Sequence, residues 1–455
     1  MNKTAELSIL SLRESALTLF KAGVNAADPY LAVKRYLSYN DNQLRIVLND
    51  SGAIHTGQWP KVHLIAFGKA ACPMITAALE IIPYQNLSGQ AIAVTNYDNV
   101  KEIAGANIIG AGHPLPDEAG FRAAKHSAEI AQQAKAGELV LVLVSGGGSA
   151  LIPYPVNSVT LREKILTTDL LLASGATINE INCVRKHLSQ IKGGGLARMA
   201  APADLYALIL SDVIGDDLSV IASGPTVADE TTFGNAIDIL NGKAIWDKIP
   251  DTVRDYLISG SQGKVKETAK PNEPCFAYTY QSLIGSNSIS VHAVIRSAQQ
   301  QGFDAILYSD ILCGEARKEA EKLVLFAKEQ LTKVGNQPLA LIAGGETTVT
   351  IKGNGRGGRN QEMALAFATS AEIHKLTGTW VFLSGGTDGR DGPTDAAGGI
   401  VDSGTIQRMQ AVGIDPDKLL ANNDSYRALK ASHDLLMTGA TGTNVADLQI
   451  LLIQP

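Results

Sequence analysis

The stretch 139-LVLVLVSGGGSALIP-153 decides the fold of this chain. Its first six residues are only Leu and Val, a pattern that predicts a parallel strand covered by helices on both faces and that is too short to span a membrane. Glycines let consecutive backbone N–H groups turn toward one point, beside the N-terminus of a following helix, so the next residues predict a loop that binds phosphate or carboxylate. The alternative is a tight turn that needs glycine only for its dihedral angles. The loop residues are Ser145, Gly146, Gly147, Gly148 and Ser149.

The composition limits what such a loop can serve. Hydrophobic residues make up 45% of a chain of 455 residues, which is longer than one core usually supports and predicts two domains. The net charge of -6 and the scattered Lys and Arg residues argue against a nucleic-acid partner. The first residues mix charges into a helical pattern without a signal-peptide core, and the four cysteines are far apart. We therefore expect a cytoplasmic protein without a membrane partner, a zinc site or a disulfide framework; a homodimer is compatible with the sequence.

Two further loops of the first half follow predicted strands. Residues 62–67 predict a strand that ends at Gly68, and Lys69 stands where a helix begins. A lysine there opposes the helix dipole unless an anion shares the site, so Lys69 is a candidate for phosphate binding, with a solvated surface lysine as the alternative. His113 lies in a loop that two prolines make rigid, where it can reach a ligand, whereas Asp117 is expected to cap the helix 118–134.

Carboxylates follow the predicted strand 205–210. Magnesium prefers oxygen ligands and needs only one or two protein carboxylates when it bridges nucleotide phosphates. Asp212 is the first candidate ligand and Asp216 the second, although Asp216 or Asp217 can instead cap a helix that begins near Leu218. The preceding segment 176–195 concentrates charged residues, for which a solvated helix is the plain interpretation.

The domain boundary is expected in the segment 259–274. This segment loses apolar periodicity and gathers Gly, Ser, Lys and Pro, a composition typical of an exposed connection. We therefore expect one domain over residues 1–270 and a second over residues 275–455. Strands and helices alternate again after the boundary, which predicts that the second domain is also α/β.

The second half contains a glycine motif with two arginines. The glycines at 353, 355 and 358 have the G-x-G-x-x-G spacing, but no acidic residue ends the next strand to hold a ribose, as a dinucleotide site would require. Arg356 and Arg359 instead place two guanidinium groups at a helix start, which favours binding of a transferring phosphoryl group or a substrate carboxylate.

A glycine-rich loop with three carboxylates follows at residues 385–399. Its spacing does not match an EF-hand. A catalytic base, an acceptor for a substrate hydroxyl and a series of Asx turns all stay open for Asp388, Asp391 and Asp395.

Ten motifs, taken in order, resemble the class II glycerate kinases, the glycerate 2-kinase family with a C-terminal MOFRL domain. They are GKAA (68–71), GHPLPDE (112–118), SGGGSAL (145–151), VRKHLSQIKGG (184–194), SDVIGDD (211–217), ASGPT (222–226), GGETTV (344–349), GRGGRNQE (355–362), GTDGRDGPTDAAG (386–398) and TGTNVADL (441–448). Most are weak alone, but ten in order are specific, and they leave only stretches such as 228–275 without a match.

This resemblance implies two α/β/α layered domains, a Rossmann-like first domain with a mostly parallel sheet and a second α/β domain, with the active site in the cleft between them. It also implies ATP-dependent phosphorylation of D-glycerate at the 2-hydroxyl, with Mg²⁺. Lys69 and Arg359 match the positions of the family's catalytic residues. We add Asp212 to these for its expected metal, and expect Arg356, Asp388 and His113 to contact the substrate.

The residues themselves reach phosphoryl transfer but not the substrate. The chain has neither a Walker A motif nor the H-R-D motif of protein kinases, so it would be a phosphate-binding enzyme of another design. Two alternatives stay open: an NAD(P)H-dependent hydroxypyruvate reductase, and a non-catalytic sensor of a nucleotide or a sugar acid.

Overall fold

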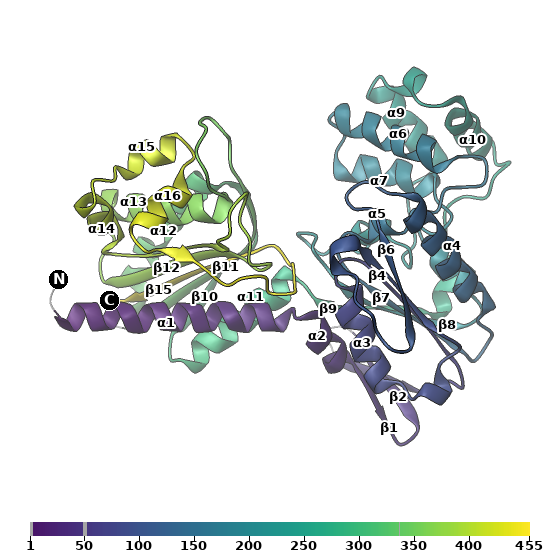
Figure 1. Ribbon diagram of the computed structural model, residues 1–455, viewed down its shortest axis with the longest axis horizontal. Helices are drawn as coiled ribbons and strands as arrows, with labels where there is room; N and C mark the ends of the chain where they lie inside the picture. The colour runs from purple at the N-terminus through teal and green to yellow at the C-terminus, as the bar shows by residue number, and fades with distance from the viewer. Residues whose placement is uncertain (1–2, 49–51, 336) are drawn as a thin grey trace. The chain divides into compact units, whose positions relative to one another are not determined.

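The computed structural model describes residues 3–48, 52–335 and 337–455. Contacts divide the chain into two compact units. The central unit is Pro29–Ile284, and the terminal unit combines Met1–Asp28 with Gly285–Pro455, so that both chain ends lie in it (Figure 1). Each unit has its own sheet covered by helices, which confirms the expected α/β class.

The sheet of the central unit has the strand order β6-β5-β4-β7-β8-β9. The pairs from β6 through β8 are parallel, which confirms the expected parallel sheet. Counted along the chain from β4, the order is 3-2-1-4-5-6, the doubly wound arrangement of Rossmann folds. The strands are β4 (Val62–Phe67), β5 (Ala91–Asn96), β6 (Ala106–Ala111), β7 (Leu139–Val144), β8 (Asp204–Leu210) and β9 (Thr279–Gly285).

Helices cover both faces of this sheet. Strand β7 is buried along its whole length, as the run of Leu and Val predicts. Val140, Val142 and Val144 pack in one cluster with α4 (Glu118–Gln133) and α8 (Gly195–Ala200), while α3 (Ala71–Ile81) contacts β4, β5 and β7. Asp117 accepts a hydrogen bond from the Gly120 backbone N–H at 2.8 Å, so it caps α4 as expected. A small antiparallel sheet joins β1 (Leu37–Asn40), β2 (Gln43–Leu48) and β3 (Ala53–Gly57), preceded by α2 (Pro29–Tyr36).

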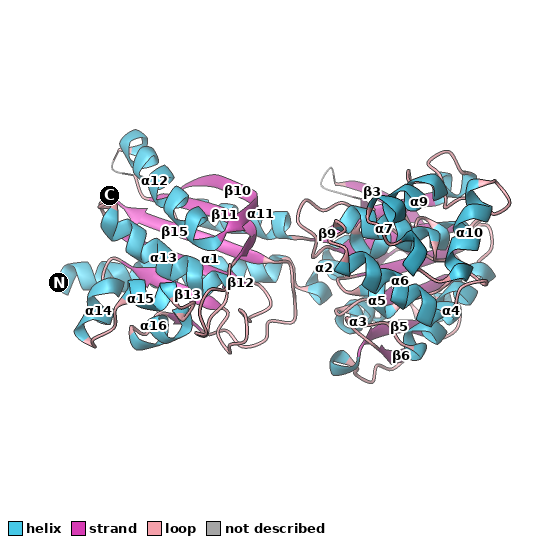
Figure 2. Cartoon of the chain, turned by 90° about the horizontal axis from the view of Figure 1, so that it is seen from above, coloured by secondary structure: helices cyan, strands magenta, loops and turns pink. Residues whose placement is uncertain are grey.

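Four helices of the central unit pack around a core of their own (Figure 2). They are α6 (Leu161–Ala173), α7 (Ile178–His187), α9 (Phe233–Gly242) and α10 (Asp251–Ser261). The first three begin at capping boxes, in which a threonine at the N-cap and a polar side chain three residues later satisfy each other's backbone N–H groups. The local sequence therefore determines where these three helices begin.

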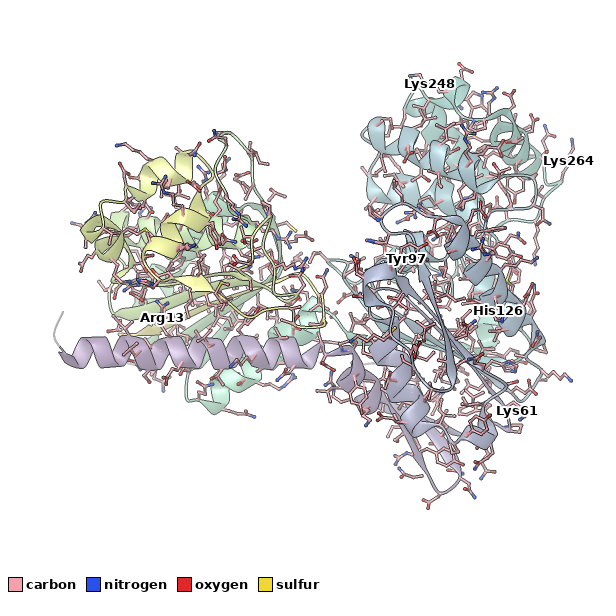
Figure 3. All side chains as sticks on the ribbon, in the orientation of Figure 1. Arg13, Lys61, Tyr97, His126, Lys248 and Lys264 are labelled. Carbon is pink, nitrogen blue, oxygen red and sulfur yellow. The ribbon has the colours of Figure 1, made fainter. Side chains whose placement is uncertain are left out.

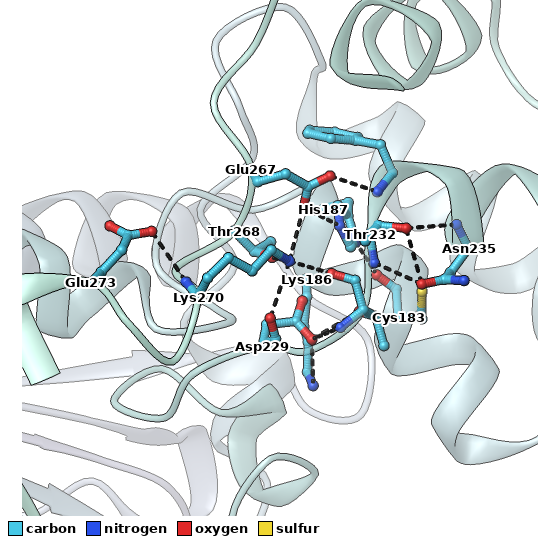
Figure 4. A network of polar contacts seen from close by, with 12 residues as sticks. Cys183, Lys186, His187, Asp229, Thr232, Asn235, Glu267, Thr268, Lys270 and Glu273 are labelled. Atoms are coloured by element: carbon cyan, nitrogen blue, oxygen red, sulfur yellow. Dashed lines mark hydrogen bonds and ion pairs between the residues drawn. The ribbon is translucent and has the colours of Figure 1, made fainter. Parts of the chain in front are cut away.

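The segment 259–274 is part of the central unit rather than the connection between domains that its composition suggested. Its Glu267 contacts the ring of His187 at 3.2 Å and accepts a hydrogen bond from the Phe233 backbone at 2.8 Å (Figure 4). Glu273 of the same segment pairs with Arg198. Two acidic side chains of the segment are thus held by partners within the central unit, and the division between the units falls after Ile284 instead.

This contact predicts a pH-dependent stability for the central unit. Burial alone would lower the pKa of His187, but hydrogen bonds with Cys183 and Glu267 outweigh it and raise the pKa from 6.5 to about 9. The resulting stabilisation, roughly 3 kcal/mol at most, should be complete below about pH 6.5 and lost as the pH rises toward 9. Burial would raise the pKa of Glu267, but hydrogen bonds with His187, the Phe233 backbone N–H and Lys270 lower it to about 2, so its contribution to stability should be lost as the pH falls from about 4.5 to 2.

Hydrogen exchange of α7 and α9 in wild type and Glu267→Gln checks this expectation. A neutral His187 still donates from Nδ1 to the Cys183 carbonyl oxygen, 2.8 Å away, and the variant removes only the part of the raised pKa that comes from Glu267. The wild type should therefore be better protected than the variant at pH 6, with a smaller difference at pH 9. An equal difference at both pH values would contradict the assignment.

The sheet of the terminal unit is mixed, with the order β10-β11-β15-β12-β13-β14. Only β10 and β11 pair in parallel, and every other neighbouring pair is antiparallel. The last strand of the chain, β15, lies in the middle, between β11 and β12. The strands are β10 (Asp304–Glu315), β11 (Leu339–Thr348), β12 (Thr379–Gly386), β13 (Gly398–Asp402), β14 (Leu435–Leu436) and β15 (Asp447–Gln454).

Alternate residues of these strands point to two helical layers. Leu339 and Leu341 pack with α12 (Ala316–Val334) and α13 (Arg359–Ile373), whereas Ala340 and Ile342 pack with α1 (Lys3–Ala26) and α11 (Asn287–Gln300). This alternation gives the expected α/β/α layers, and Figure 1 shows α1 running along one side of the sheet. Shorter helices complete the first layer: α14 (Thr405–Ala411), α15 (Pro416–Ala421) and α16 (Ser425–Ala431).

The compact units differ from the expected domains at both ends of the first one. Leu12, Ala16, Leu19 and Phe20 of α1 are buried against the terminal sheet, so the first 28 residues join the terminal unit. Strand β9, which we expected to open the second domain, is instead the edge strand beside β8. Both differences arise because segments far apart in the sequence pack together: α1 joins the sheet of the terminal unit, and β9 joins the sheet of the central unit.

Candidate functional site

The glycine loop 145–149 and the Lys69 loop follow two paired strands. Phe67 and Val144 are register partners at the carboxyl ends of β4 and β7, where the order of a doubly wound sheet reverses and ligands usually bind. The loops are joined by hydrogen bonds from the Lys69 backbone N–H to the Gly146 carbonyl, 2.9 Å, and from the Ala70 N–H to the Ser145 hydroxyl, 3.0 Å. The structure thus brings together two candidates that lie far apart in the sequence.

The loop itself needs its glycines. Gly147 has a φ of 80°, in the left-handed region that favours glycine. A methyl group added there would lie 3.0 Å from the His113 ring and 3.3 Å from the Lys69 side chain, and one added at Gly146 would overlap the Asp212 carboxylate. The helix expected after the loop is only the single turn α5 (Gly148–Leu151), so any anion binding must come from side chains and loop N–H groups.

Lys69, His113 and Asp212 therefore converge on the glycine loop from three different strand ends. Burial raises the pKa of Asp212, although the nearby Lys69 charge acts in the opposite direction. Burial also lowers the pKa of His113, and the Lys69 charge adds to that effect. The arrangement places one ammonium group near a partly buried carboxylate and an imidazole of lowered pKa, an environment suited to an anionic ligand.

The sequence did not single out the residues that hold the far end of this loop. The Ser149 hydroxyl lies 2.8 Å from the Ser223 hydroxyl and accepts a hydrogen bond from Lys192 at 2.7 Å. Ala222 and Ser223 have φ values of 51° and 61°, a strained conformation that is common at functional sites. Lys192 is 1% exposed, so part of the charged segment 176–195 is buried and not the solvated helix of the plain interpretation.

The second and third carboxylates of the loop after β8 shape a turn. Asp217 accepts a hydrogen bond from the Ser219 backbone N–H at 2.8 Å, and η3 (Ile221–Ser223) follows in place of the helix expected near Leu218. Asp216 has a left-handed φ of 55°. Within residues 3–48, 52–335 and 337–455, no group of three His, Cys, Asp or Glu side chains could hold a metal ion together.

A second group of candidates lies in the terminal unit, at the start of α13. Arg359 donates two hydrogen bonds to the Asp447 carboxylate, at 2.6 and 2.9 Å, and pairs with Glu346 at 2.8 Å. Asp391 caps α13 by accepting from the backbone N–H groups of Asn360 and Gln361, at 3.1 and 2.8 Å. Burial raises the pKa of Asp391 to about 6, despite these hydrogen bonds. Of the three carboxylates in the 385–399 loop, Asp391 thus has a structural role.

Arg356 lines a cavity of about 420 Å³ with Arg390 and Asp395. Its guanidinium lies 5.0 Å from the centre of the Tyr426 ring, and its Nε donates to the Pro393 carbonyl at 3.1 Å. Asp388 accepts a hydrogen bond from the Arg390 backbone N–H at 2.9 Å, which is the Asx turn considered above. A substrate contact by Asp388 stays a prediction.

The G-x-G-x-x-G segment is occupied by contacts within the protein. The Gly353 and Arg356 backbone N–H groups donate to the side chains of Asn423 and Asp424, at 3.0 and 3.1 Å, and the Gly355 N–H donates to a backbone carbonyl at 2.9 Å. These are the N–H groups that a dinucleotide pyrophosphate would need. The geometry therefore agrees with the interpretation against a nicotinamide site.

Comparisons with known proteins identify the same two halves. The family described as a domain of unknown function, DUF4147, matches residues 15–258, and the MOFRL family matches residues 339–447. A glycerate 2-kinase of Pyrococcus horikoshii is 44% identical over 98% of this chain and 98% of its own length. A crystal structure of glycerate kinase from Thermotoga maritima is 40% identical, covers 97% of this chain and 99% of that chain, and has a TM-score of 0.85.

A third relative carries a different name. A protein of Agrobacterium vitis, provisionally named a hydroxypyruvate reductase, is 38% identical over 98% of this chain and 95% of its own length. Among the described residues, no helix is long and apolar enough to cross a membrane. The chain belongs to the glycerate kinase family in which a DUF4147 domain is followed by a MOFRL domain.

Proposed function

We propose that this protein phosphorylates D-glycerate at the 2-hydroxyl with ATP, giving 2-phosphoglycerate and ADP. The observation that carries the proposal is the convergence of Lys69, His113 and Asp212 on the 145–149 loop at the switch point of the sheet. The near full-length similarity to proteins named glycerate 2-kinase and glycerate kinase supplies the substrate and the reaction. The substrates are therefore small molecules. We expect the enzyme to work in the cytoplasm, and a homodimer is compatible with this function.

Phosphoryl transfer needs positioning and charge stabilisation more than covalent chemistry. In this proposal the N–H groups and hydroxyls of the 145–149 loop hold nucleotide phosphates, and Lys69 stabilises charge that grows on the transferring group. Arg359 supplies a second, planar cation, while Arg356, Asp388 and His113 contact the substrate.

We further propose that Mg²⁺ accompanies the nucleotide, bound by Asp212 with Asp216 as a second ligand. Magnesium would neutralise phosphate charge when bound. The residues fit a metal held mainly by phosphates, because Asp212 faces the loop while no complete protein cage is present among the described residues.

Asp212→Asn should raise the Mg²⁺ concentration needed for half-maximal turnover by roughly tenfold or more, since the amide keeps the shape but loses the anionic ligand. Metal titrations of wild type and variant at saturating ATP check this. Asp217→Asn, in a residue that shapes the following turn, is the matched control and should titrate like the wild type. Full activity of the wild type in excess EDTA would remove the metal from the proposal.

The proposed reaction is tested by incubating the purified chain with ATP and D-glycerate and identifying the product by NMR. The phosphorus–proton coupling to the C2 proton identifies 2-phosphoglycerate, and ADP should form in equal amount. The name of the Agrobacterium vitis relative makes a hydroxypyruvate reductase the second candidate. Oxidation of NADH or NADPH by hydroxypyruvate, without formation of ADP from ATP in the presence of glycerate, would replace the kinase by that candidate. Nucleotide or glycerate binding without turnover of either kind would indicate a sensor.

A further inference from the structure

Three cationic side chains gather behind the far end of the glycine loop. Lys192 donates to the Ser149 carbonyl at 3.0 Å, and Arg185 donates to the same carbonyl at 3.3 Å. Lys164 of α6 donates to the backbone carbonyls of Arg185 and Leu188, at 3.1 and 2.7 Å. Lys164 and Lys192 are only 5% and 1% exposed, and Arg185 is partly buried.

None of these three cations forms an ion pair with a carboxylate in the part of the chain that the structure describes. Their partners are carbonyl and hydroxyl oxygens, which satisfy the N–H donors but carry no full negative charge. Lys186, one residue from Arg185, shows the usual solution, because it reaches the Asp229 carboxylate at 3.4 Å. Buried charges are normally paired, so this cluster lacks one or more negative charges.

The pKa values of the two lysines also indicate that negative charge is missing from this cluster. Burial lowers the pKa of Lys164 well below its usual range, and the Arg185 charge lowers it further. Burial also lowers the pKa of Lys192 well below its usual range, and the charges of Arg185 and Lys164 lower it further. An anion bound here would reverse these effects by offsetting the repulsion among the three cations.

The cluster borders a cavity of about 120 Å³. Lys164, Arg185 and Ser149 are among its polar lining, and apolar walls come from residues such as Pro116, Pro153 and Leu161. This volume equals that of about four water molecules at roughly 30 Å³ each, enough for a small acid but not for a nucleoside. Asp169 also lines the cavity, but its side chain is exposed and forms no ion pair with the three cations.

We propose that Lys164 and Arg185, with the nearby charge of Lys192, form an anion subsite beside Ser149 that binds the carboxylate of a small hydroxy acid. The planar fork of Arg185 matches a carboxylate, and the cavity next to the phosphate loop suits a molecule of a few carbon atoms. Identifying this acid as glycerate rests on the proposed function, whereas the subsite itself does not. A nucleotide phosphate could supply the same negative charge, and the experiment separates the two sources.

Thermal unfolding of the full chain gives a readout that does not depend on turnover. We expect D-glycerate, but not the neutral glycerol, to raise the Tm of the wild type, because a ligand that binds only the folded state stabilises it. Lys164→Met should keep or raise the Tm of the free protein, since it removes a buried charge, and should lose the shift with D-glycerate. Arg162→Gln, at an exposed position of the same helix, is the matched control and should respond like the wild type.

Kinetics add a second readout. Lys164→Met should raise KM for D-glycerate roughly 10- to 100-fold, the range expected for a lost charge-assisted contact, with little change in KM for ATP. Arg185→Lys, which keeps the charge and loses the fork, should show a smaller increase. Arg185→Gln provides the same test if Lys164→Met does not fold.

Several results would overturn the subsite. A lower Tm of free Lys164→Met with an unchanged glycerate shift would indicate a purely structural cluster. If Lys164→Met keeps the Tm shift with D-glycerate and loses the shift with MgADP or inorganic phosphate, the cluster binds a phosphate instead of the acid. If the wild type instead responds to glycolate or lactate and not to glycerate, with the response lost in Lys164→Met, the subsite stands and the proposed substrate fails. No response of the wild type to any of these anions would overturn the subsite.

Discussion

Lys69→Met should lower kcat by roughly 100-fold or more while leaving the fold intact. One electrostatic contact to charge that develops in the transition state typically has an effect of this size. Lys69 is the cation nearest Gly147 in the glycine loop, and its charge reaches both Asp212 and His113. Methionine keeps most of the apolar stem, so the loss would report on the ammonium group. Steady-state kinetics at saturating ATP and glycerate measure it.

The control for this variant is Lys61→Met. Lys61 precedes β4 by one residue, is exposed and is labelled in Figure 3. Its replacement removes the same charge from the same unit and should leave kcat within about twofold of the wild type, because exposed charges away from the site interact weakly through water. An unchanged kcat in Lys69→Met would show that Lys69 does not stabilise the transferring group, whatever the control does.

Arg359→Ala should have the second large effect, on stability as well as on turnover. The Asp447 carboxylate is completely buried, and Arg359 holds it through two hydrogen bonds. Removing one partner of a buried pair leaves an uncompensated charge, which costs about 3–5 kcal/mol. We also expect kcat to fall roughly 100-fold, because a planar cation that would stabilise the transferring group is lost. Arg359→Lys should lose nearly as much turnover, since lysine keeps the charge without the fork.

A double variant separates the two roles of Arg359. In Arg359→Ala combined with Asp447→Asn, the buried charge is removed together with its partner, so much of the lost stability should return. If Arg359 acts in catalysis, kcat stays low in this folded double variant. Chemical denaturation and steady-state kinetics on the same samples compare the two effects. Recovery of both stability and wild-type turnover would make Arg359 a structural residue only.

These two predictions depend differently on sequence and structure. The G-K-A-A context already made Lys69 a candidate, because a lysine at the end of a strand opposes the dipole of the next helix. The sequence around Arg359 did not predict its ion pair with Asp447, because Asp447 is 88 residues away. The structural part of the second prediction therefore follows only from the three-dimensional contact.

The sequence by itself determined features that depend on near neighbours. The six Leu and Val residues of β7 predicted a strand buried on both faces because no face of it could meet water. The position of Asp117 ahead of its helix predicted the cap of α4, since a cap forms within three residues. The order of motifs also predicted the family, because each motif is local and ten of them share one sequence order.

Only the tertiary structure decided which of these local pieces meet. Strand order 3-2-1-4-5-6 places Lys69 beside the 145–149 loop, and the return of the chain makes β15 the middle strand of the second sheet. Long-range packing also buries Lys192, which lies in a segment for which a solvated helix was the plain interpretation, and holds Glu267 in a segment whose composition suggested a linker. Periodicity and composition describe what a residue prefers among its neighbours in sequence, whereas burial and pairing are set by long-range packing, which can hold a charged group against its local preference.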